Sequence, residues 1–357
     1  MKKIVMIGTQ FGTMGGISSV VNVYRAAGLF EKFDIRYIAT HGDGSAAGKL
    51  RIAALALAAY LKLLLLSRIA LLHIHVSSRA SFWRKLPFFA LATLWRVPTI
   101  LHIHSGAFDQ FYARQGWLGQ RLIRWTLDRA TRVIVLSHSW RDWVGTVSAN
   151  RHVVALYNPV AVPAWSAAQD PAVAADILML GRLGRPKGTY DLLEAWQLAR
   201  QAVPSVTLSL GGDGEREQVA QWAAAHQFGD HVRLLGWVTG DNKEHYFQSA
   251  SIYALPSYSE GLPMSVLEAM ARGLPVISTP VGGIPEAISH GVEGYLVAPG
   301  DVPALASHLA QLLAEPALRQ RMGEAGRRKV QAVFSTEVIL PRLESIYREL
   351  GCEPPQA

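Results

Sequence analysis

Two glutamates in the segment Ser257–Asp301 have the spacing of residues that do chemistry. Glu260 and Glu268 bracket a turn between an expected strand over residues 252–257 and an expected helix, with Pro263 suited to its first turn. The N–H groups at the start of such a helix lack partners within it, and together with the helix dipole they form an anion site. A carboxylate at each end of this site favours a phosphate ligand flanked by hydroxyl-rich groups, a sugar on one side and a ribose on the other.

This segment resembles the retaining glycosyltransferases of family 4, also called group 1, which share the GT-B fold. Four motifs of that family occur here in order: E-x7-E at Glu260–Glu268, G-x-P-V-I at Gly273–Ile277, G-G-x-P-E at Gly282–Glu286 and G-x-x-G-x-L-V-x-P-G-D at Gly291–Asp301. The resemblance covers the C-terminal half in detail and the N-terminal half in outline.

A second anion-binding candidate is the segment Gly181–Gly188, which follows an expected strand. Arg182 offers a planar fork to phosphate oxygens and Lys187 a compact charge, and both can reach one anion. The spacing of a Walker A loop is absent. The resemblance implies that Arg182 and Lys187 hold the donor diphosphate, that Glu268 holds the ribose and that Glu260 borders the transferred sugar. In the turn itself, Leu262, Met264 and Ser265 can offer backbone N–H groups to the β-phosphate or the sugar, and together with Gly261 they are expected to contact the donor.

In the N-terminal half, Gly15 and Gly16 open a helix after the first strand, and the resemblance places this turn near the donor phosphate. The pattern is not G-x-G-x-x-G, so NAD binding is disfavoured. His104 aligns with a family histidine beside the donor sugar. With Arg182, Lys187 and Glu260 it completes the expected catalytic set.

Three further histidines, His73, His75 and His102, lie in two expected His-x-His strands and are interpreted as structural. Together with His104 they make four histidines that suggest a metal site, but no nearby Cys or H-E-x-x-H motif completes one, and the resemblance implies that no metal is needed to bind the donor. We therefore expect neither a metal nor another cofactor beyond the nucleotide-sugar co-substrate.

The segment SSRASFWRK, residues 77–85, is expected to form a loop with a basic and aromatic cluster. Arg79, Arg84 and Lys85, with Trp83, suit an acceptor that carries a diphosphate on a lipid. Ordinary surface charges are a nearly equal alternative.

The charge of the chain is unevenly distributed, although its net value is +8. Residues 1–157 hold 20 Lys/Arg and 6 Asp/Glu, whereas residues 158–357 hold 15 and 21. Six of the ten tryptophans lie in the basic half, a composition typical of contact with an anionic membrane. No nucleic-acid-binding motif is present, so nucleic acid is not an expected partner.

No membrane span or signal peptide is expected. The apolar stretch 52–72 is interrupted by Lys62 and Arg68, and is interpreted as a helix over 50–66 and a strand over 69–76. The single cysteine, Cys352, excludes an internal disulfide and favours a reducing compartment. We expect a cytoplasmic protein, peripheral on the inner face of the cell membrane.

Strand and helix patterns alternate along the chain, which is typical of an α/β fold with parallel sheets. We predict two doubly wound, Rossmann-like domains facing across a cleft: an acceptor-side domain over 1–160, a linker over 161–175 and a donor-binding domain over 176–334. By resemblance, a C-terminal helix over 335–351 returns to the first domain.

The predicted function is transfer of a hexose, with retention, from a UDP- or GDP-linked donor to a glycan or polyprenyl-diphosphate-linked acceptor. Bacterial exopolysaccharide, O-antigen or glycolipid assembly is the expected setting. A nucleotide-sugar epimerase of the same fold and a non-catalytic nucleotide-sugar-binding subunit are the alternatives. A phosphorylase is disfavoured because the pyridoxal lysine motif is not found.

Overall fold

The computed structural model describes residues 2–164, 176–201 and 203–355 of the chain. It divides into two compact units, one formed by Met1–Pro159 with Thr336–Ala357 and the other by Val160–Ser335. Residues 165–175, most of the predicted linker, lie outside the described residues. The acceptor and donor roles assigned to the two domains stay predictions.

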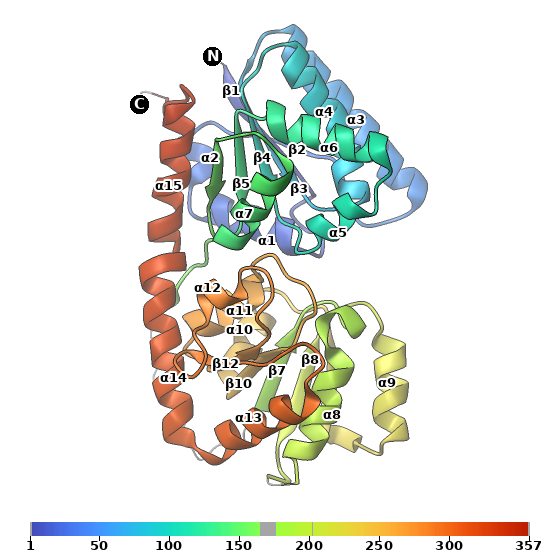
Figure 1. The fold of residues 1–357 in the computed structure, drawn as a ribbon, viewed down its shortest axis with the longest axis vertical. Helices are drawn as coiled ribbons and strands as arrows, with labels where there is room; N and C mark the ends of the chain where they lie inside the picture. Colours follow the sequence, from blue (N-terminus) through green and yellow to red (C-terminus); the bar gives the residue numbers. More distant parts are fainter. Residues whose placement is uncertain (1, 165–175, 202, 356–357) are drawn as a thin grey trace. The chain divides into compact units, whose positions relative to one another are not determined.

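The first unit, called unit 1 below, is built on a six-stranded parallel sheet in the order β2-β1-β3-β4-β5-β6 (Figure 1). Its strands are β1 (Lys3–Gly8), β2 (Arg36–Ala39), β3 (Ile69–Val76), β4 (Thr99–Ile103), β5 (Arg132–Val135) and β6 (Val153–Ala155). Its helices are α1 (Gly16–Ala26), α2 (Leu29–Lys32), α3 (Ala46–Leu65), α4 (Ala80–Leu94), α5 (Phe108–Ala113), α6 (Trp117–Arg129), α7 (His138–Val147) and α15 (Thr336–Glu349).

The apolar stretch 52–72, for which a membrane span is not expected, forms most of α3 and the start of β3. The helix begins earlier than predicted because the Ser45 hydroxyl caps it, accepting a hydrogen bond from the Gly48 N–H at 3.2 Å. Among the described residues, no helix combines the length and apolarity needed to cross a bilayer.

The C-terminal helix α15 belongs to unit 1, as the resemblance implied. Its Tyr347 hydroxyl lies 2.8 Å from His73 Nδ1 on β3, and its Glu344 forms an ion pair of 2.7 Å with Lys32 on α2. A buried tyrosine and a half-buried ion pair therefore fix the helix against the sheet of unit 1 (Figure 1, red).

The second unit, unit 2, also has a six-stranded parallel sheet, in the order β12-β11-β10-β7-β8-β9. Its strands are β7 (Asp176–Leu180), β8 (Thr207–Gly211), β9 (Val232–Gly236), β10 (Ile252–Leu255), β11 (Val276–Ser278) and β12 (Gly294–Leu296). Its helices are η1 (Arg185–Lys187), α8 (Thr189–Ala199), α9 (Arg216–Ala225), η2 (Gly229–His231), α10 (Gly240–Ser249), α11 (Met264–Ala271), α12 (Ile284–Ala287), α13 (Val302–Ala314), α14 (Pro316–Lys329) and η3 (Val330–Phe334).

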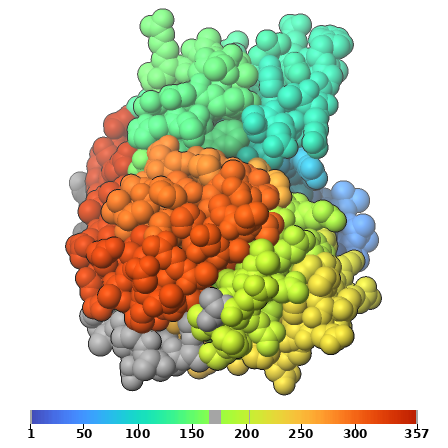
Figure 2. Space-filling view, turned by 60° about the horizontal axis from the view of Figure 1, so that its bottom comes forward, coloured from blue at the N-terminus to red at the C-terminus, as the bar shows by residue number. Residues whose placement is uncertain are grey.

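Both sheets have the doubly wound order that the strand–helix alternation predicts. In unit 2 the chain moves outward from β7 to β9 and then restarts at β10 on the other side of β7, so the β7–β10 pair is a topological switch point. The corresponding pair in unit 1 is β1 and β3. Helices α13 and α8 pack together in unit 2, and Figure 2 shows their surfaces side by side in red-orange and yellow-green.

One predicted element is wrong. The segment 77–85 was expected to be a loop, but α4 begins at Ala80, so Arg84 and Lys85 are helical. The apolar residues of α4, among them Phe82, Phe88 and Phe89, pack into the core of unit 1, and this burial favours the helix over a loop. Of the three basic residues in this segment, Arg79 alone lies outside the helix, with φ 57°.

Candidate functional site

The residues predicted to hold the donor lie after β7 and β10, the two strands at the switch point of unit 2. Arg182 and Lys187 follow β7, while Glu260 follows β10 and Glu268 lies on α11. Ligands of doubly wound folds bind beyond the carboxyl ends of strands at this point. The topology therefore brings two segments about 80 residues apart in sequence to one edge of the sheet.

Lys187 and Glu260 form an ion pair at this edge. Lys187 Nζ lies 2.5 Å from Glu260 Oε1, which also accepts a hydrogen bond of 2.7 Å from the Ser257 hydroxyl. Glu260 is buried, whereas about a quarter of the Lys187 side chain is exposed. The lysine can therefore reach an incoming anion while the carboxylate stays in place.

Two glycines allow the loops of this site to approach closely. Gly188 has φ 67°, and a Cβ there would lie 2.1 Å from the carbonyl oxygen of Pro256 at the end of β10. Gly282 has φ 58°, and a Cβ there would meet the Glu260 carbonyl oxygen. Because any side chain would separate these segments, the glycines of the two motifs hold the Lys187 and Glu260 loops in position.

Helix α11 begins at Met264, one residue later than predicted. Pro263 is the N-cap, with an extended ψ of 125°, so it precedes the first turn instead of opening it. Gly273 has φ 75° just after the helix, the conformation expected of a C′ glycine. The backbone around Leu262, Met264 and Ser265 therefore starts the helix that the anion site requires, although Leu262 and Met264 have buried side chains.

Glu268 on α11 is paired in this structure with Lys243 on α10. Lys243 Nζ lies 2.7 Å from Oε1 and 2.6 Å from Oε2 of the carboxylate. About a quarter of the lysine and a sixth of the glutamate side chain are exposed. A ribose that binds Glu268 would share or displace this lysine.

Arg182 is exposed and extends from the loop between β7 and η1. Within the described part of the chain, its guanidinium forms no hydrogen bond or ion pair. An unpaired guanidinium next to the Lys187 loop is suited to bind phosphate oxygens without first breaking an internal contact.

In unit 1, Gly15 and Gly16 start α1 directly beyond β1, at the β1–β3 switch point. The Gly15 carbonyl accepts hydrogen bonds from the Ser18 hydroxyl at 2.7 Å and the Ser19 hydroxyl at 3.1 Å. These bonds fix the turn at the start of α1.

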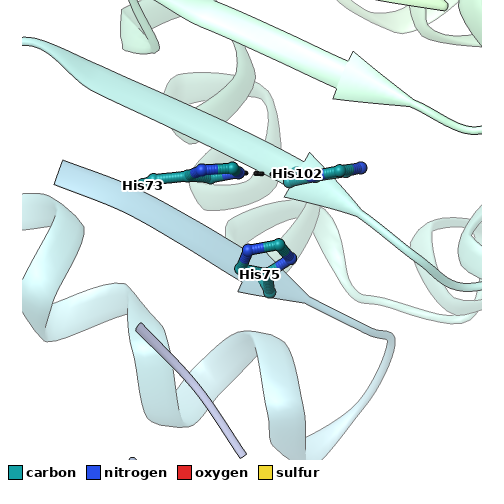
Figure 3. Close-up of side chains that lie close together, drawn as sticks. All are labelled: His73, His75 and His102. Carbon is teal, nitrogen blue, oxygen red and sulfur yellow. Dashed lines mark hydrogen bonds between the residues drawn. The ribbon is translucent and has the colours of Figure 1, made fainter. Parts of the chain in front are cut away.

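The four histidines of unit 1 form one array across β3 and β4, and Figure 3 shows three of them. His73 Nε2 lies 3.2 Å from His102 Nδ1, and His75 Nδ1 lies 2.8 Å from His104 Nε2. Stacked or tilted rings connect the two pairs, with 4.4 Å between the ring centroids of His73 and His75. Burial lowers the pKa of His73 and of His104 to about 3 and places that of His75 and His102 well below the usual range.

His73, His75 and His102 are also the described residues that could hold a metal ion, since their ligand nitrogens lie within 4.8 Å of one another. A metal there would replace the His73–His102 hydrogen bond. It would also lie near Lys85, whose charge already lowers the pKa of His75. These observations favour the interpretation of a neutral, hydrogen-bonded array, and the expectation of no metal stays a prediction.

The three basic residues predicted for the acceptor differ in their surroundings. Arg79 is exposed and Arg84 is half-buried. Lys85 is 1% exposed and donates a hydrogen bond of 3.0 Å to the Ser81 hydroxyl. The prediction of a common surface cluster is therefore wrong for Lys85, because its position on α4 turns it into the protein.

Several partners of the candidate site residues were missed in the sequence. Ser257 bonds Glu260, Lys243 pairs with Glu268, and Tyr347 bonds His73. Ser257 lies only three residues before Glu260, so the motif itself could have indicated it. Lys243 and Tyr347 come from helices 25 and 274 residues away, and no local spacing predicts such contacts.

Comparison with known proteins identifies the family. Residues 169–329 match the family "Glycosyl transferases group 1", and residues 31–159 match "Glycosyl transferase 4-like domain". The chain belongs to the group 1 glycosyltransferases and has the GT-B fold.

Individual relatives agree with this placement. The chain is 27% identical to glycogen synthase of Mycobacterium tuberculosis over 73% of its own length and 65% of that protein. It is 34% identical to the amylovoran biosynthesis glycosyltransferase AmsK of Erwinia amylovora over 49% and 45% of the two chains. The chain thus spans less than two thirds of the curated relatives that it matches.

Solved structures share the fold. Sucrose-phosphate synthase of Thermosynechococcus elongatus superposes with a TM-score of 0.79 at 21% identity, covering 98% of this chain and 99% of that one. Anabaena HepE in complex with UDP-glucose superposes with a TM-score of 0.77 at 19% identity, covering 98% and 100%.

Proposed function

We propose that this chain transfers a hexose, with retention of anomeric configuration, from a UDP- or GDP-linked sugar to an acceptor. The observation that carries the proposal is the group of Arg182, Lys187, Glu260 and Glu268 around the β7–β10 switch point. The HepE complexes with UDP and UDP-glucose support a nucleotide-sugar as the donor.

In the proposed reaction, the diphosphate of the donor is the leaving group. Arg182, Lys187 and the start of α11 stabilise its developing charge, which is the main electrostatic contribution that such a site can make. Glu268 accepts hydrogen bonds from the ribose hydroxyls, and Glu260 borders the transferred sugar. In unit 1, His104 is proposed to contact a sugar hydroxyl. The pKa of His104 is lowered by burial, so its ring is neutral near pH 7 and can accept a hydrogen bond from a sugar hydroxyl.

A protein nucleophile is not part of this proposal. The departing diphosphate removes the proton of the acceptor hydroxyl on the same face of the sugar, and the protein contributes position and charge. Glu260 is already held by Lys187 and Ser257, which suits a positioning role better than that of an attacking carboxylate. No metal or other cofactor is required in this scheme.

The proposed acceptor is a glycan or a polyprenyl-diphosphate-linked sugar at an anionic membrane on the cytoplasmic side. AmsK acts in amylovoran biosynthesis, and a further relative, CapM of Staphylococcus aureus, acts in capsular polysaccharide biosynthesis. In unit 1, α6 exposes Trp117 and Leu118 beside the exposed Arg121 and Arg124. Exposed aromatic and basic side chains on one helix are suited to the interface of such a membrane.

The test uses the full chain with radiolabelled UDP- and GDP-hexoses and a short-chain polyprenyl-diphosphate sugar. If the chain is a transferase, the label should appear in the lipid product, and an equal amount of nucleoside diphosphate should be released. Interconversion of the donor sugars without transfer would instead indicate an epimerase. Tight binding of the donor without turnover by any acceptor of the panel would favour a binding subunit.

A further inference from the structure

Lys85 is a buried cation that no carboxylate neutralises among the described residues. It is 1% exposed, and its ammonium group has three donors, of which one bonds the Ser81 hydroxyl at 3.0 Å. Burial and the charge of Arg84 lower its pKa to about 7. Removing an ammonium group from water is costly unless it is paired, so this arrangement lacks a partner of opposite charge.

Two other buried nitrogen atoms, close enough to Lys85 to interact electrostatically with it, lack a hydrogen-bond partner in the part of the chain that the structure describes. Arg84 Nε and His41 Nδ1 are buried atoms without a hydrogen-bond partner among the described residues. The charges of Arg84, Lys49 and Lys85 all lower the pKa of His41, and only Asp43 opposes them. The groups around His41 therefore include three cations and a single carboxylate.

These residues lie at the edge of the sheet where ligands of doubly wound folds bind. His41 follows β2 and α4 follows β3, so both lie at the carboxyl edge of the sheet beside the β1–β3 switch point. Lys85 also lies close enough to His104 to lower its pKa, and His104 is the histidine proposed to contact a sugar hydroxyl. A ligand at Lys85 would therefore lie near His104.

We infer that Lys85, Arg84 and His41 form a subsite for a phosphate or diphosphate group of the acceptor. The anion supplies the charge and the acceptor atoms that these three side chains lack. Phosphate oxygens can accept from the Arg84 fork and the Lys85 ammonium together. That the bound anion belongs to the acceptor rests on the proposed function. Binding of an anion at this site can be tested without any transfer reaction.

The test is calorimetric titration of the full chain with inorganic pyrophosphate in the presence of saturating UDP. The UDP occupies the site proposed in unit 2, so the remaining pyrophosphate binding reports on unit 1. Lys85→Met and Arg84→Gln should each weaken it at least about tenfold, as expected when a charged hydrogen bond to a buried anion is lost. Arg129→Gln, which changes an exposed arginine of the same unit, is the matched control and should change the pyrophosphate affinity less than about twofold.

Unchanged affinity in both Lys85→Met and Arg84→Gln, or no binding to the wild type, would overturn the inference. Lys85→Met removes a buried charge and shortens the unbranched side chain by only one atom, so its melting temperature should equal or exceed that of the wild type. If it does not fold, Arg84→Gln and His41→Gln decide the matter, since both residues are half-buried.

Failure of the inference and failure of the proposed function give different results. Glu268→Gln should weaken UDP binding and leave pyrophosphate binding intact. Lys85→Met should weaken pyrophosphate binding and leave UDP binding intact. Farnesyl diphosphate and a hexose phosphate, titrated in the same way, distinguish a lipid diphosphate from a soluble sugar phosphate. Competition of either with pyrophosphate in the wild type, lost in Lys85→Met, identifies the source.

Discussion

Lys187 is held by a carboxylate in the free protein, and this contact determines what happens when a diphosphate binds. The Glu260 pair keeps the ammonium group at the strand edge, so little side-chain entropy is lost when a phosphate replaces the carboxylate as its main partner. Arg182, exposed and without such a contact, has to be ordered by the ligand. The two cations therefore contribute in different ways, one by preorganisation and one by a geometry suited to two phosphate oxygens.

We predict that Arg182→Ala and Lys187→Ala each lower kcat/KM roughly 100-fold or more, because the leaving diphosphate loses a charged partner. Steady-state transfer kinetics measure this. Arg185→Ala is the control, since Arg185 is a neighbouring exposed cation that lies over the Tyr190 ring. Lys187→Ala also leaves the buried Glu260 without its cation, so a lower melting temperature is expected in that variant alone. Near-normal activity in both variants would remove the diphosphate assignment.

A second prediction concerns the ribose. Glu268→Gln keeps the shape of the side chain but removes the charge that strengthens hydrogen bonds from hydroxyl groups, so UDP or GDP should bind about tenfold more weakly. Glu244→Gln is the matched control, because Glu244 is also an ion-paired glutamate, bound to Arg272. Equal affinity of both variants and the wild type in calorimetry would show that Glu268 does not hold the nucleoside.

The candidate site could be predicted from the sequence wherever its residues lie in one short segment. The turn between β10 and α11 was predicted because Glu260, Pro263 and Gly273 follow one another within 14 residues. The contacts of Lys243 with Glu268 and of Tyr347 with His73 join distant helices, and only tertiary packing creates them. The burial of Lys85 could not be predicted either. A lysine is expected to be exposed, but the position of Lys85 on α4 buries it.

At the scale of elements, strands β3 and β4 place four imidazoles inside unit 1. Their folded pKa values are lowered by burial, whereas an unfolded histidine titrates near 6.5. Below pH 6.5 the unfolded chain therefore binds more protons than the folded one, and the stability of unit 1 falls as the pH decreases from 6.5 towards 3.

We predict that the melting temperature of the protein drops by more than about 5 °C between pH 7 and pH 5, as expected if the array costs one or two kcal/mol over that range. His75→Asn retains an acceptor near the Nδ1 position that contacts His104 but cannot be protonated, so it should reduce the drop. His138→Asn, which changes an exposed histidine of the same unit, should leave the drop unchanged. An equal pH dependence of all three proteins would contradict the interpretation of a neutral array.

The doubly wound sheets could be predicted because parallel strands buried on both faces have continuous apolar sequences, as in β3 and β7. The helix that begins within the segment 77–85 could not be predicted. The charged and small residues of this segment obscure the apolar spacing of Phe82 and Phe89 in α4. The pattern of this helix becomes clear only over its whole length of 15 residues, and the charged segment ends before the middle of it.

At the scale of the whole molecule, the net positive charge lies in the N-terminal part of the chain, since residues 1–157 hold 20 Lys/Arg and 6 Asp/Glu. Lys85 is buried and cannot contribute to a contact with a membrane surface. Arg79, Arg121 and Arg124 are exposed, and each basic residue near an anionic surface adds about 1 kcal/mol.

We predict that the protein sediments with anionic vesicles at low salt, that binding weakens as salt screens the charges, and that neutral vesicles bind it less. Trp117→Ser should reduce this binding, because Trp117 is 73% exposed on α6. Trp237→Ser, which changes an exposed tryptophan of unit 2, is the control. Equal binding to both kinds of vesicle, or none to either, would leave a soluble acceptor as the better proposal.

The central claim is that unit 2 binds a nucleotide-diphospho-sugar at the β7–β10 switch point. The most direct measurement is thermal stabilisation of the full chain by a panel of UDP-, GDP-, ADP- and dTDP-linked hexoses, with the Lys187→Ala variant in parallel. A ligand that binds only the folded state stabilises it, so we predict that one nucleotide class raises the melting temperature by at least about 4 °C at saturation. The Lys187→Ala variant should lose most of this shift. No shift with any member of the panel, or an equal shift in Lys187→Ala, would contradict the account.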